Sequence, residues 1–278
     1  MTVTPILRSR IGLQVAAAVV VVYALAPVVW IVSLSLKGGD DINNQRFWPS
    51  EVSWENYRTV FDTALFTSAL RNSLGIALIA TVLALVIATG AAYAATRLSY
   101  PGRQVALNIA LVVTIFPAIS IATPLFDLWR RIGLYDTWPG LIIPYISLTL
   151  PVAMWTLSSY FREIPRELEQ AAQVDGATTW QTFRSVVAPL AAPGIFTSAI
   201  LAFLIAWNDF VYGITLTSTD NARPVPAALA FFSGESQFQQ PTAAISAAAV
   251  VVTIPVVLVV VLFQRRIVAG LTSGAVKG

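Results

Sequence analysis

The sequence predicts an all-α membrane protein in which six helices cross the bilayer, and three observations support this prediction. Of the 278 residues, 56% are hydrophobic and only 11% are charged, against about 25% charged residues in an ordinary soluble domain. Six segments hold the run of about 20 apolar residues that a helix needs to cross a hydrocarbon core about 30 Å thick. Basic residues are more frequent on one side of these segments, as in cytoplasmic loops. The six segments are 11–36, 70–95, 105–126, 139–160, 194–216 and 242–263.

The first segment is expected to remain in the protein as a membrane anchor. Arg8 and Arg10 precede it, and the Ala-Leu-Ala at 24–26 resembles the cleavage site of a signal peptide. The apolar run is too long for a signal peptide, however, and Pro27 should hinder cleavage. Ten Arg and Lys residues then lie on the side of the N-terminus and seven on the other side. This bias predicts cytoplasmic N- and C-termini.

Two longer segments on the outer side and several prolines interrupt the apolar pattern. The segment 38–68 is rich in aromatic residues of the kind that anchor proteins at the membrane interface. The segment 217–241 has the prolines and polar residues of a structured surface loop. Prolines within the spans leave backbone carbonyls of the preceding turn without a hydrogen bond. Such carbonyls can face a water-filled pathway or occur in kinked structural helices, and the sequence leaves both possibilities open. These prolines are Pro117, Pro124, Pro144, Pro151 and Pro255.

The composition also excludes several classes of function. Cysteine and histidine are absent, which excludes disulfides, Cys/His metal sites, and Ser/His or Cys/His catalytic pairs. Neither lysine, Lys37 nor Lys277, follows a glycine, so the chain lacks the Gly-Lys-Ser/Thr of a phosphate-binding loop. The net charge is only +3, and no long basic run indicates a nucleic-acid partner. If ATP drives this protein, another chain binds it.

The cytoplasmic segment 161–192 is the longest polar interruption and predicts two short helices joined at a glycine. Pro165 suits the first turn of the first helix, and Gly176 is expected to end it in the left-handed conformation. Thr178 and Gln181 have the spacing of a capping box at the start of the second helix. Pro189 is expected to end that helix.

Each of these helices has an apolar face that something must cover. The protein's own helix ends or the lipid surface are one possible cover, and a docked soluble partner is the other. The spacing of the residues leaves both possibilities open. The apolar faces are formed by Ile164, Leu168, Ala171 and Ala172 in the first helix and by Trp180, Phe183 and Val187 in the second.

The same segment resembles the EAA loop of the membrane subunits of ABC importers. The pattern of that loop is Glu-Ala-Ala, three residues, Gly, nine residues, Ile, one residue and Leu-Pro. Gln170 stands here in place of the family's glutamate, with Glu169 one position early. In the family that glutamate pairs with an arginine of the ATPase, and a neutral amide loses the charge assistance that about doubles the strength of such a hydrogen bond. The matching residues are Gln170, Ala171, Ala172, Asp175, Gly176, Ala177, Val186, Ala188 and Pro189.

Over its whole length the chain resembles the MalG-type permeases of the carbohydrate ABC importers. The resemblance includes Ala-Trp-Asn-Asp-Phe at 206–210 and the tail 265–278. It implies one permease domain, 1–278, of the ABC type I importer fold, with a cytoplasmic coupling loop at 161–192. It also implies a bacterial cell membrane, a second permease, an ATPase dimer that binds ATP and Mg²⁺, and an extracytoplasmic sugar-binding protein. Residues of the tail are implied at the interface of the ATPase subunits, namely Gly270, Leu271, Thr272, Val276 and Lys277.

The cargo follows from a narrower resemblance. The segment 123–145, together with the tail, is most similar to permeases of trehalose importers, which implies a disaccharide and favours trehalose. In position, the outer segment 217–241 resembles the part of these permeases that reaches into the binding protein.

Asp209 is the only acidic residue well inside a predicted span. An aspartate at the centre of a membrane helix costs about 2.5–3.5 kcal/mol on the insertion scale, so such residues are candidates for function inside the bundle. Asn208 and Asp209 are therefore candidate sugar contacts, with a polar clamp between helices as the alternative. A proton- or ion-coupled secondary transporter using Asp209 is the rival function. An intramembrane aspartyl enzyme would need a second carboxylate.

Overall fold

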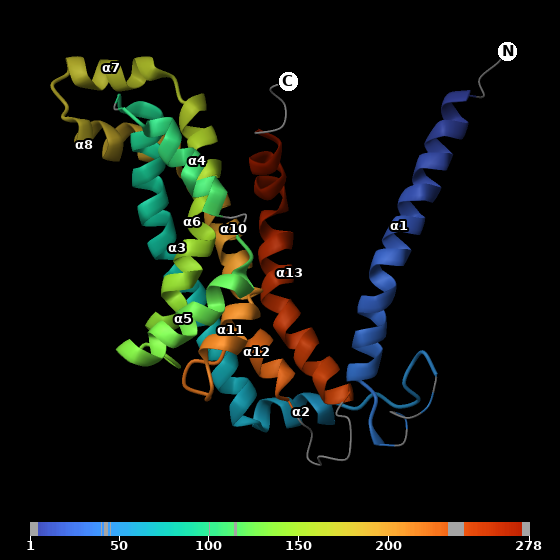
Figure 1. Ribbon diagram of the computed structural model, residues 1–278. Helices are drawn as coiled ribbons and strands as arrows, with labels where there is room; N and C mark the ends of the chain where they lie inside the picture. The colour runs from blue at the N-terminus through green and yellow to red at the C-terminus, as the bar shows by residue number, and fades with distance from the viewer. Residues whose placement is uncertain are drawn as a thin grey trace. The chain divides into compact units, whose positions relative to one another are not determined.

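The computed structural model describes residues 5–39, 41, 44, 46–99, 101–113, 116–232 and 242–273. For residues 5–11, 104, 106, 113 and 265–273, the structure describes the backbone but not the side chains. The described residues form helices and connecting turns without strands (Figure 1), which confirms the all-α class. Among them, four helices are long and apolar enough to cross a membrane. These are α1 (Pro5–Ser35), α3 (Ala64–Arg97), α6 (Trp138–Glu163) and α13 (Thr242–Ser273).

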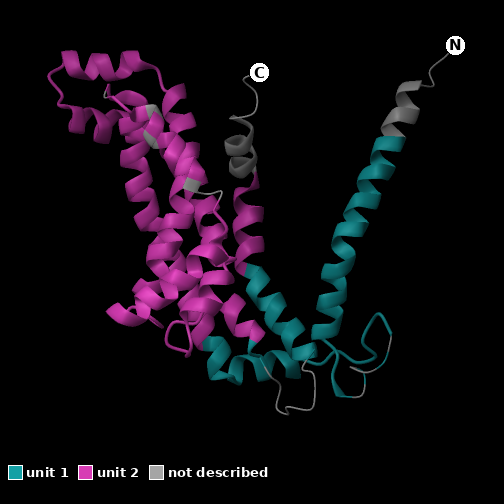
Figure 2. Cartoon of the chain, in the orientation of Figure 1, with its two compact units in different colours: residues 1–67, 231–254 teal, residues 68–230, 255–278 magenta. Residues whose placement is uncertain are grey.

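Two compact units share the chain (Figure 2). The first comprises residues 1–67 and 231–254, the second residues 68–230 and 255–278. In the first unit, which includes α2 (Glu55–Asp62), the side chain of Lys37 is fully buried. Its ammonium group donates to the backbone oxygens of Arg46 at 2.6 Å and Asn44 at 3.2 Å. A buried charge needs such partners, so Lys37 holds the chain that follows α1.

Six continuous spanning helices are not confirmed, because two of the predicted spans are divided. The third span consists of α4 (Arg103–Val113) and α5 (Ala118–Ile132). Pro117 precedes α5 in an extended conformation, with φ −62° and ψ 129°, and proline has no N–H to donate within a helix.

The fifth span consists of α10 (Ala192–Trp207) and α11 (Val211–Leu216). Between them, a carboxylate oxygen of Asp209 accepts a hydrogen bond from the amide of Gly213 at 3.1 Å. Aspartate side chains compete for backbone amides in this way and interrupt helices. The expectation of an unbroken helix over 194–216 is therefore wrong at 208–210.

The core of the second unit relies on small residues where helices cross. A Cβ atom on Gly75 of α3 would lie 2.3 Å from the Trp138 ring of α6. A Cβ atom on Gly194 of α10 would lie 2.4 Å from the Tyr160 ring of α6. Close approach of helix backbones over glycine and alanine is typical of membrane bundles. It fixes α6 between α3 and α10.

At one end of the second unit, two short helices lie beside the ends of α3 and α6 (Figure 1). They are α7 (Arg166–Val174) and α8 (Thr179–Thr182). The opposite end holds α5, α11 and α12 (Val225–Ala230). The second unit thus separates the predicted cytoplasmic helix pair from the predicted outer loop.

The expectation that Pro189 ends the second short helix is confirmed to within one residue, but the helix is less regular than expected. After α8 the chain continues through a π-helical turn (Phe183–Val187) and α9 (Ala188–Leu190). It then bends by 72° into α10. The amide of Ala188 bonds to the Phe183 oxygen, five residues back, so the regular hydrogen-bond ladder is already interrupted where Pro189 lacks its N–H.

Candidate functional site

The turn between α7 and α8 has the geometry that the glycine predicts. Gly176 takes a left-handed conformation with φ +84°. The amide of Ala177 donates to the oxygen of Ala172 at 2.9 Å, and the amide of Gly176 donates to the oxygen of Gln173 at 3.0 Å. These two bonds define a Schellman motif, which satisfies carbonyls at the end of a helix. The predicted end of the first helix is confirmed.

The start of α8 is the predicted capping box. The hydroxyl of Thr178 accepts a hydrogen bond from the amide of Gln181 at 3.3 Å, and the Gln181 side-chain oxygen accepts one from the amide of Thr178 at 2.8 Å. Two amides that the helix leaves unpaired are thereby satisfied. Because Thr178 follows the Schellman turn directly, the angle between α7 and α8 is set by bonds on both sides of Gly176.

A buried ion pair ties α7 to the membrane helices. The guanidinium of Arg97, in the last turn of α3, lies 3.2 Å from a carboxylate oxygen of Glu169 on α7. The exposed fractions of the two side chains are only 4% and 11%. The hydroxyl of Tyr93 donates to the other carboxylate oxygen at 3.3 Å. A buried carboxylate is thus held by one cation and one hydroxyl.

Arg97 also binds the C-terminal end of α6. Its guanidinium donates to the backbone oxygen of Ile164 at 2.5 Å and to that of Phe161. The last carbonyls of a helix lack intrahelical partners and carry partial negative charge. Arg97 therefore joins the ends of α3 and α6 to α7, and we call this group of Tyr93, Arg97, Phe161, Ile164 and Glu169 the Arg97 junction.

The sequence analysis did not identify Arg97 or Tyr93 as site residues. The available signal was weak: an arginine closing an apolar span, and a tyrosine one helical turn before it. Such residues are ordinary at membrane interfaces, and only the fold brings them next to Glu169.

The helix pair has one covered face and one open face. On the covered face, the ring of Phe183 lies 4.8 Å from that of Tyr93, and Val187 is fully buried. On the open face, Val174 is 87% exposed and Trp180 is 66% exposed. The protein's own helix ends thus cover part of the apolar surface only. A partner can reach the rest.

Most of the family-matched positions lie on or beside this open face. Ala172 and Ala177 are half-buried. The exposed positions are Gln170, Ala171, Asp175, Gly176 and Pro189. Glu169 points instead into the protein, so it is not available to take the place of the family's glutamate.

The tail residues can be followed only in part. Gly270, Leu271 and Thr272 continue α13, but their side chains are not described. Val276 and Lys277 lie outside the described residues.

Asn208 and Asp209 have different surroundings. Asp209 is 9% exposed, and its carboxylate interacts with the backbone amides that begin α11 and with the hydroxyl of Tyr145. Asn208 is exposed, and its amide donates to the Leu204 oxygen at 2.8 Å. Of the two candidate sugar contacts, Asn208 is therefore the more accessible, whereas Asp209 stabilises the break between α10 and α11.

The described part of the outer segment is bonded to α3 and to the turn between α5 and α6. The amide of Asn72, on α3, donates to the backbone oxygens of Asp220 at 2.9 Å and Arg223 at 3.2 Å. The carboxylate of Asp136 accepts from the amides of Ser218 at 2.9 Å and Thr219 at 3.1 Å. These bonds order the first part of the loop, while 233–241 lie outside the described residues.

Comparison with known proteins agrees with this architecture. SugB, a trehalose transport system permease of Mycobacterium tuberculosis, is 55% identical over 93% of this chain and 94% of its own. MalG, a trehalose/maltose transport system permease of Thermococcus litoralis, is 35% identical over 97% of both chains. The crystal structure of a bacterial ABC transporter that imports alginate contains a chain of the same fold. It has a TM-score of 0.81 at 23% identity and covers 95% of this chain and 98% of that one.

The family model that matches residues 84–273 covers α6, the helix pair and α10. The chain belongs to the family of binding-protein-dependent transport system inner membrane components.

Proposed function

We propose that the chain is the permease subunit of an ATP-driven sugar importer, with trehalose as its cargo. The similarity to permeases named for trehalose and for trehalose/maltose transport supports the cargo. The observation that carries the proposal is the open face of α7 and α8 above the Arg97 junction. It presents apolar residues at a membrane protein's surface, on helices too short to cross a bilayer.

In this proposal the open face docks on a separate ATPase. That ATPase binds ATP and Mg²⁺, a second permease completes the passage, and an extracytoplasmic binding protein delivers the sugar. The contact residues on this chain are Gln170, Ala171, Ala172, Asp175, Gly176, Ala177 and Pro189. Tail residues Gly270, Leu271, Thr272, Val276 and Lys277 reach the same ATPase, and Asn208 and Asp209 belong to the sugar pathway.

The Arg97 junction gives the coupling a physical route. When the ATPase closes, it moves the helix pair, and the buried bonds of Arg97 pass that movement to the ends of α3 and α6. A chain of bonds that is shielded from water transmits such a displacement better than exposed bonds, which water screens and replaces. The membrane helices therefore move with α7 rather than independently of it.

The turn at Gly176 provides the test. A left-handed conformation costs about 1–2 kcal/mol for a residue with a Cβ, and no neighbouring atom lies within 4 Å of a Cβ placed there. Gly176→Val should therefore change the backbone of the turn without a clash. We expect sugar-stimulated ATP hydrolysis and uptake to become uncoupled at normal membrane abundance.

Gly176→Asn is the matched control, because asparagine tolerates the left-handed conformation. It should retain most of the uptake. If Gly176→Val transports sugar with normal stimulation of the ATPase, the coupling role of this turn is wrong. A protonophore separates the rival function: uptake that stops with the protonophore and persists without ATP would indicate a secondary transporter.

A further inference from the structure

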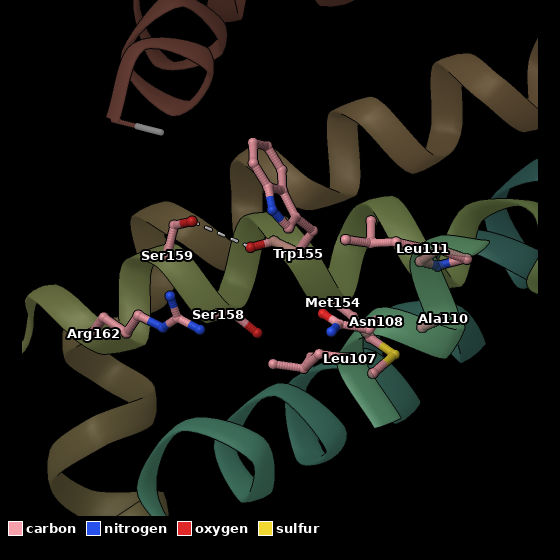
Figure 3. A pocket seen from close by; sticks show the side chains of 10 residues that line it. Leu107, Asn108, Ala110, Leu111, Met154, Trp155, Ser158, Ser159 and Arg162 are labelled. Carbon is pink, nitrogen blue, oxygen red and sulfur yellow. Dashed lines mark hydrogen bonds between the residues drawn. The ribbon is translucent and has the colours of Figure 1, made fainter. Parts of the chain in front are cut away.

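A cavity of about 160 Å³ lies between α4 and α6 in the second unit (Figure 3). Arg162, in the last turn of α6, lines it, so the cavity is near the end of the unit that carries α7 and α8. One water molecule needs only about 10–15 Å³ of such space. The cavity has room for part of a much larger solute.

Ser158 is the residue that points to a ligand. Its side chain is 4% exposed, and its hydroxyl lacks a hydrogen-bond partner among the described residues. Other hydroxyls on the same helix do bond to the preceding turn: Thr149 donates to the Tyr145 oxygen at 2.8 Å and Ser159 to the Trp155 oxygen at 3.3 Å. A buried hydroxyl without a partner is costly. A polar molecule in the cavity would remove that cost.

The remaining polar groups restrict the chemistry of this molecule. Figure 3 shows Asn108 of α4 and both Ser158 and Arg162 of α6 turned toward the space between the two helices. The described lining contains one cation and no carboxylate, which disfavours a cationic solute. An amide and a hydroxyl both donate and accept, and a guanidinium only donates. Together they match a neutral solute rich in hydroxyl groups.

The exposed side chains of α6 include a polar one, whereas those in the middle turns of α3 do not. The exposed side chains of α3 that face outward in its middle turns include Leu78, Val82 and Val86, all aliphatic. Along α6 the exposed side chains are mixed, because Ser147 is exposed together with the apolar Ile143 and Trp155. Polar side chains in membrane helices face a bundle interior or a water-filled space. The exposed Ser147 of α6 therefore agrees with a passage beside this helix.

From these observations we propose that the cavity is a sugar-contact site on the exit side of the passage. The hydroxyls of a neutral saccharide bond there to Ser158, Asn108 and Arg162. This inference rests on the proposed function, since it names a place where the cargo of that function is bound.

The absence of native cysteine allows a direct test in the complete transporter. Ser158→Cys changes little in volume and places a thiol in the cavity, whereas Val86→Cys places one on the aliphatic face of α3. Each variant is assembled with the ATPase, the second permease and the binding protein, after the cysteines of these three partners have been replaced. The complexes are then treated with a membrane-impermeant, charged thiosulfonate reagent. Thiols react as thiolates, which hydrocarbon disfavours. We expect the Ser158→Cys site to react about tenfold faster than the Val86→Cys site.

Trehalose should protect the thiol at Ser158→Cys when transport is running. If trehalose occupies two-thirds of the Ser158→Cys sites, the reagent should modify the thiol about threefold more slowly. A sugar that is not transported is the control and should give no protection. If trehalose at a saturating concentration does not slow the reaction while Ser158→Cys still imports trehalose at a measurable rate, even a reduced one, the sugar-contact site is refuted. Two other results would also refute it. The first is that anionic lipid, and not trehalose, protects the thiol of Ser158→Cys from the reagent. The second is that this thiol stays unreactive in every state because the second permease covers it. Failure of the proposed function would appear separately, as wild-type transporter that does not import trehalose with ATP.

Discussion

The ion pair between Arg97 and Glu169 allows the sharpest prediction about this protein. Glu169→Gln removes the negative charge and leaves the Arg97 guanidinium buried, with an exposed fraction of 4% for its side chain. Removing one partner from a buried pair costs about 3–5 kcal/mol. The neutral amide is still a polar group beside the guanidinium, so the lower end of this range, about 3 kcal/mol, is expected.

The assay is thermal inactivation of the purified permease in its complex. A loss of about 3 kcal/mol corresponds to a midpoint that falls by about 6 °C or more for a chain of this size. Glu167→Gln is the matched control, because it removes the same charge from an exposed position of the same helix. Surface charges of this kind contribute about 0–1 kcal/mol. The control should therefore leave the midpoint almost unchanged.

A double-mutant cycle then tests whether the two groups act on each other. Arg97→Leu alone leaves the Glu169 carboxylate buried without its cation, and Glu169→Leu alone leaves the Arg97 guanidinium buried without its anion. Arg97→Leu combined with Glu169→Leu removes both charges, and hydrophobic replacement of a whole buried pair is often neutral. We expect the double variant to be more stable than Arg97→Leu, with a coupling free energy of about 0.5–3 kcal/mol. Equal midpoints for Glu169→Gln and Glu167→Gln would refute the structural role of the pair.

Three further predictions concern local structure. Thr178→Ala removes the hydroxyl of the capping box and should lower stability by about 1 kcal/mol, measured as a lower midpoint of thermal inactivation. Gly194→Ala places a Cβ 2.4 Å from the Tyr160 ring and should cost about 1–3 kcal/mol, whereas Gly90→Ala, which meets no atom within 4 Å, should not destabilise the complex. A backbone hydrogen bond lowers the pKa of the Asp41 carboxyl below its usual 3.8, so its contribution to the local fold is full above the unfolded pKa and is lost as pH falls through the folded pKa. Carboxyl titration followed by NMR should show this lowered pKa in the wild type and a normal one in the unfolded chain.

The local signals in the sequence predict the helix pair closely. Gly176 and the Thr178–Gln181 spacing act through bonds between residues no more than five positions apart in the chain, so their outcome depends little on the rest of the protein. Pro189 predicts the end of the second helix to within one residue, but the π-helical turn before it was not predicted. Such a turn has no recognisable pattern in the sequence.

Longer-range features of the site did not follow from the sequence in the same way. The break at Asp209 depends on its carboxylate reaching the amide of Gly213, which an apolar window cannot reveal. The cavity beside Ser158 is lined by side chains of both α4 and α6, which no local pattern in the sequence brings together. Apolar content predicts that a segment enters the membrane, but it does not distinguish one helix from two shorter helices at an angle.

The position of the acid on α7 explains why a shift of one residue matters. Successive residues on a helix are separated by about 100° around its axis, so Glu169 and Gln170 face different surroundings. Glu169 reaches Arg97 inside the protein, while Gln170 lies on the open face. The two positions therefore serve different contacts: one holds α7 to the membrane helices, and the other is available to a docked partner. In the proposed docking, a glutamine at the second position lowers the charge of the open face without weakening the junction beneath it, so the strength of docking would vary while the link from α7 to α3 and α6 is retained.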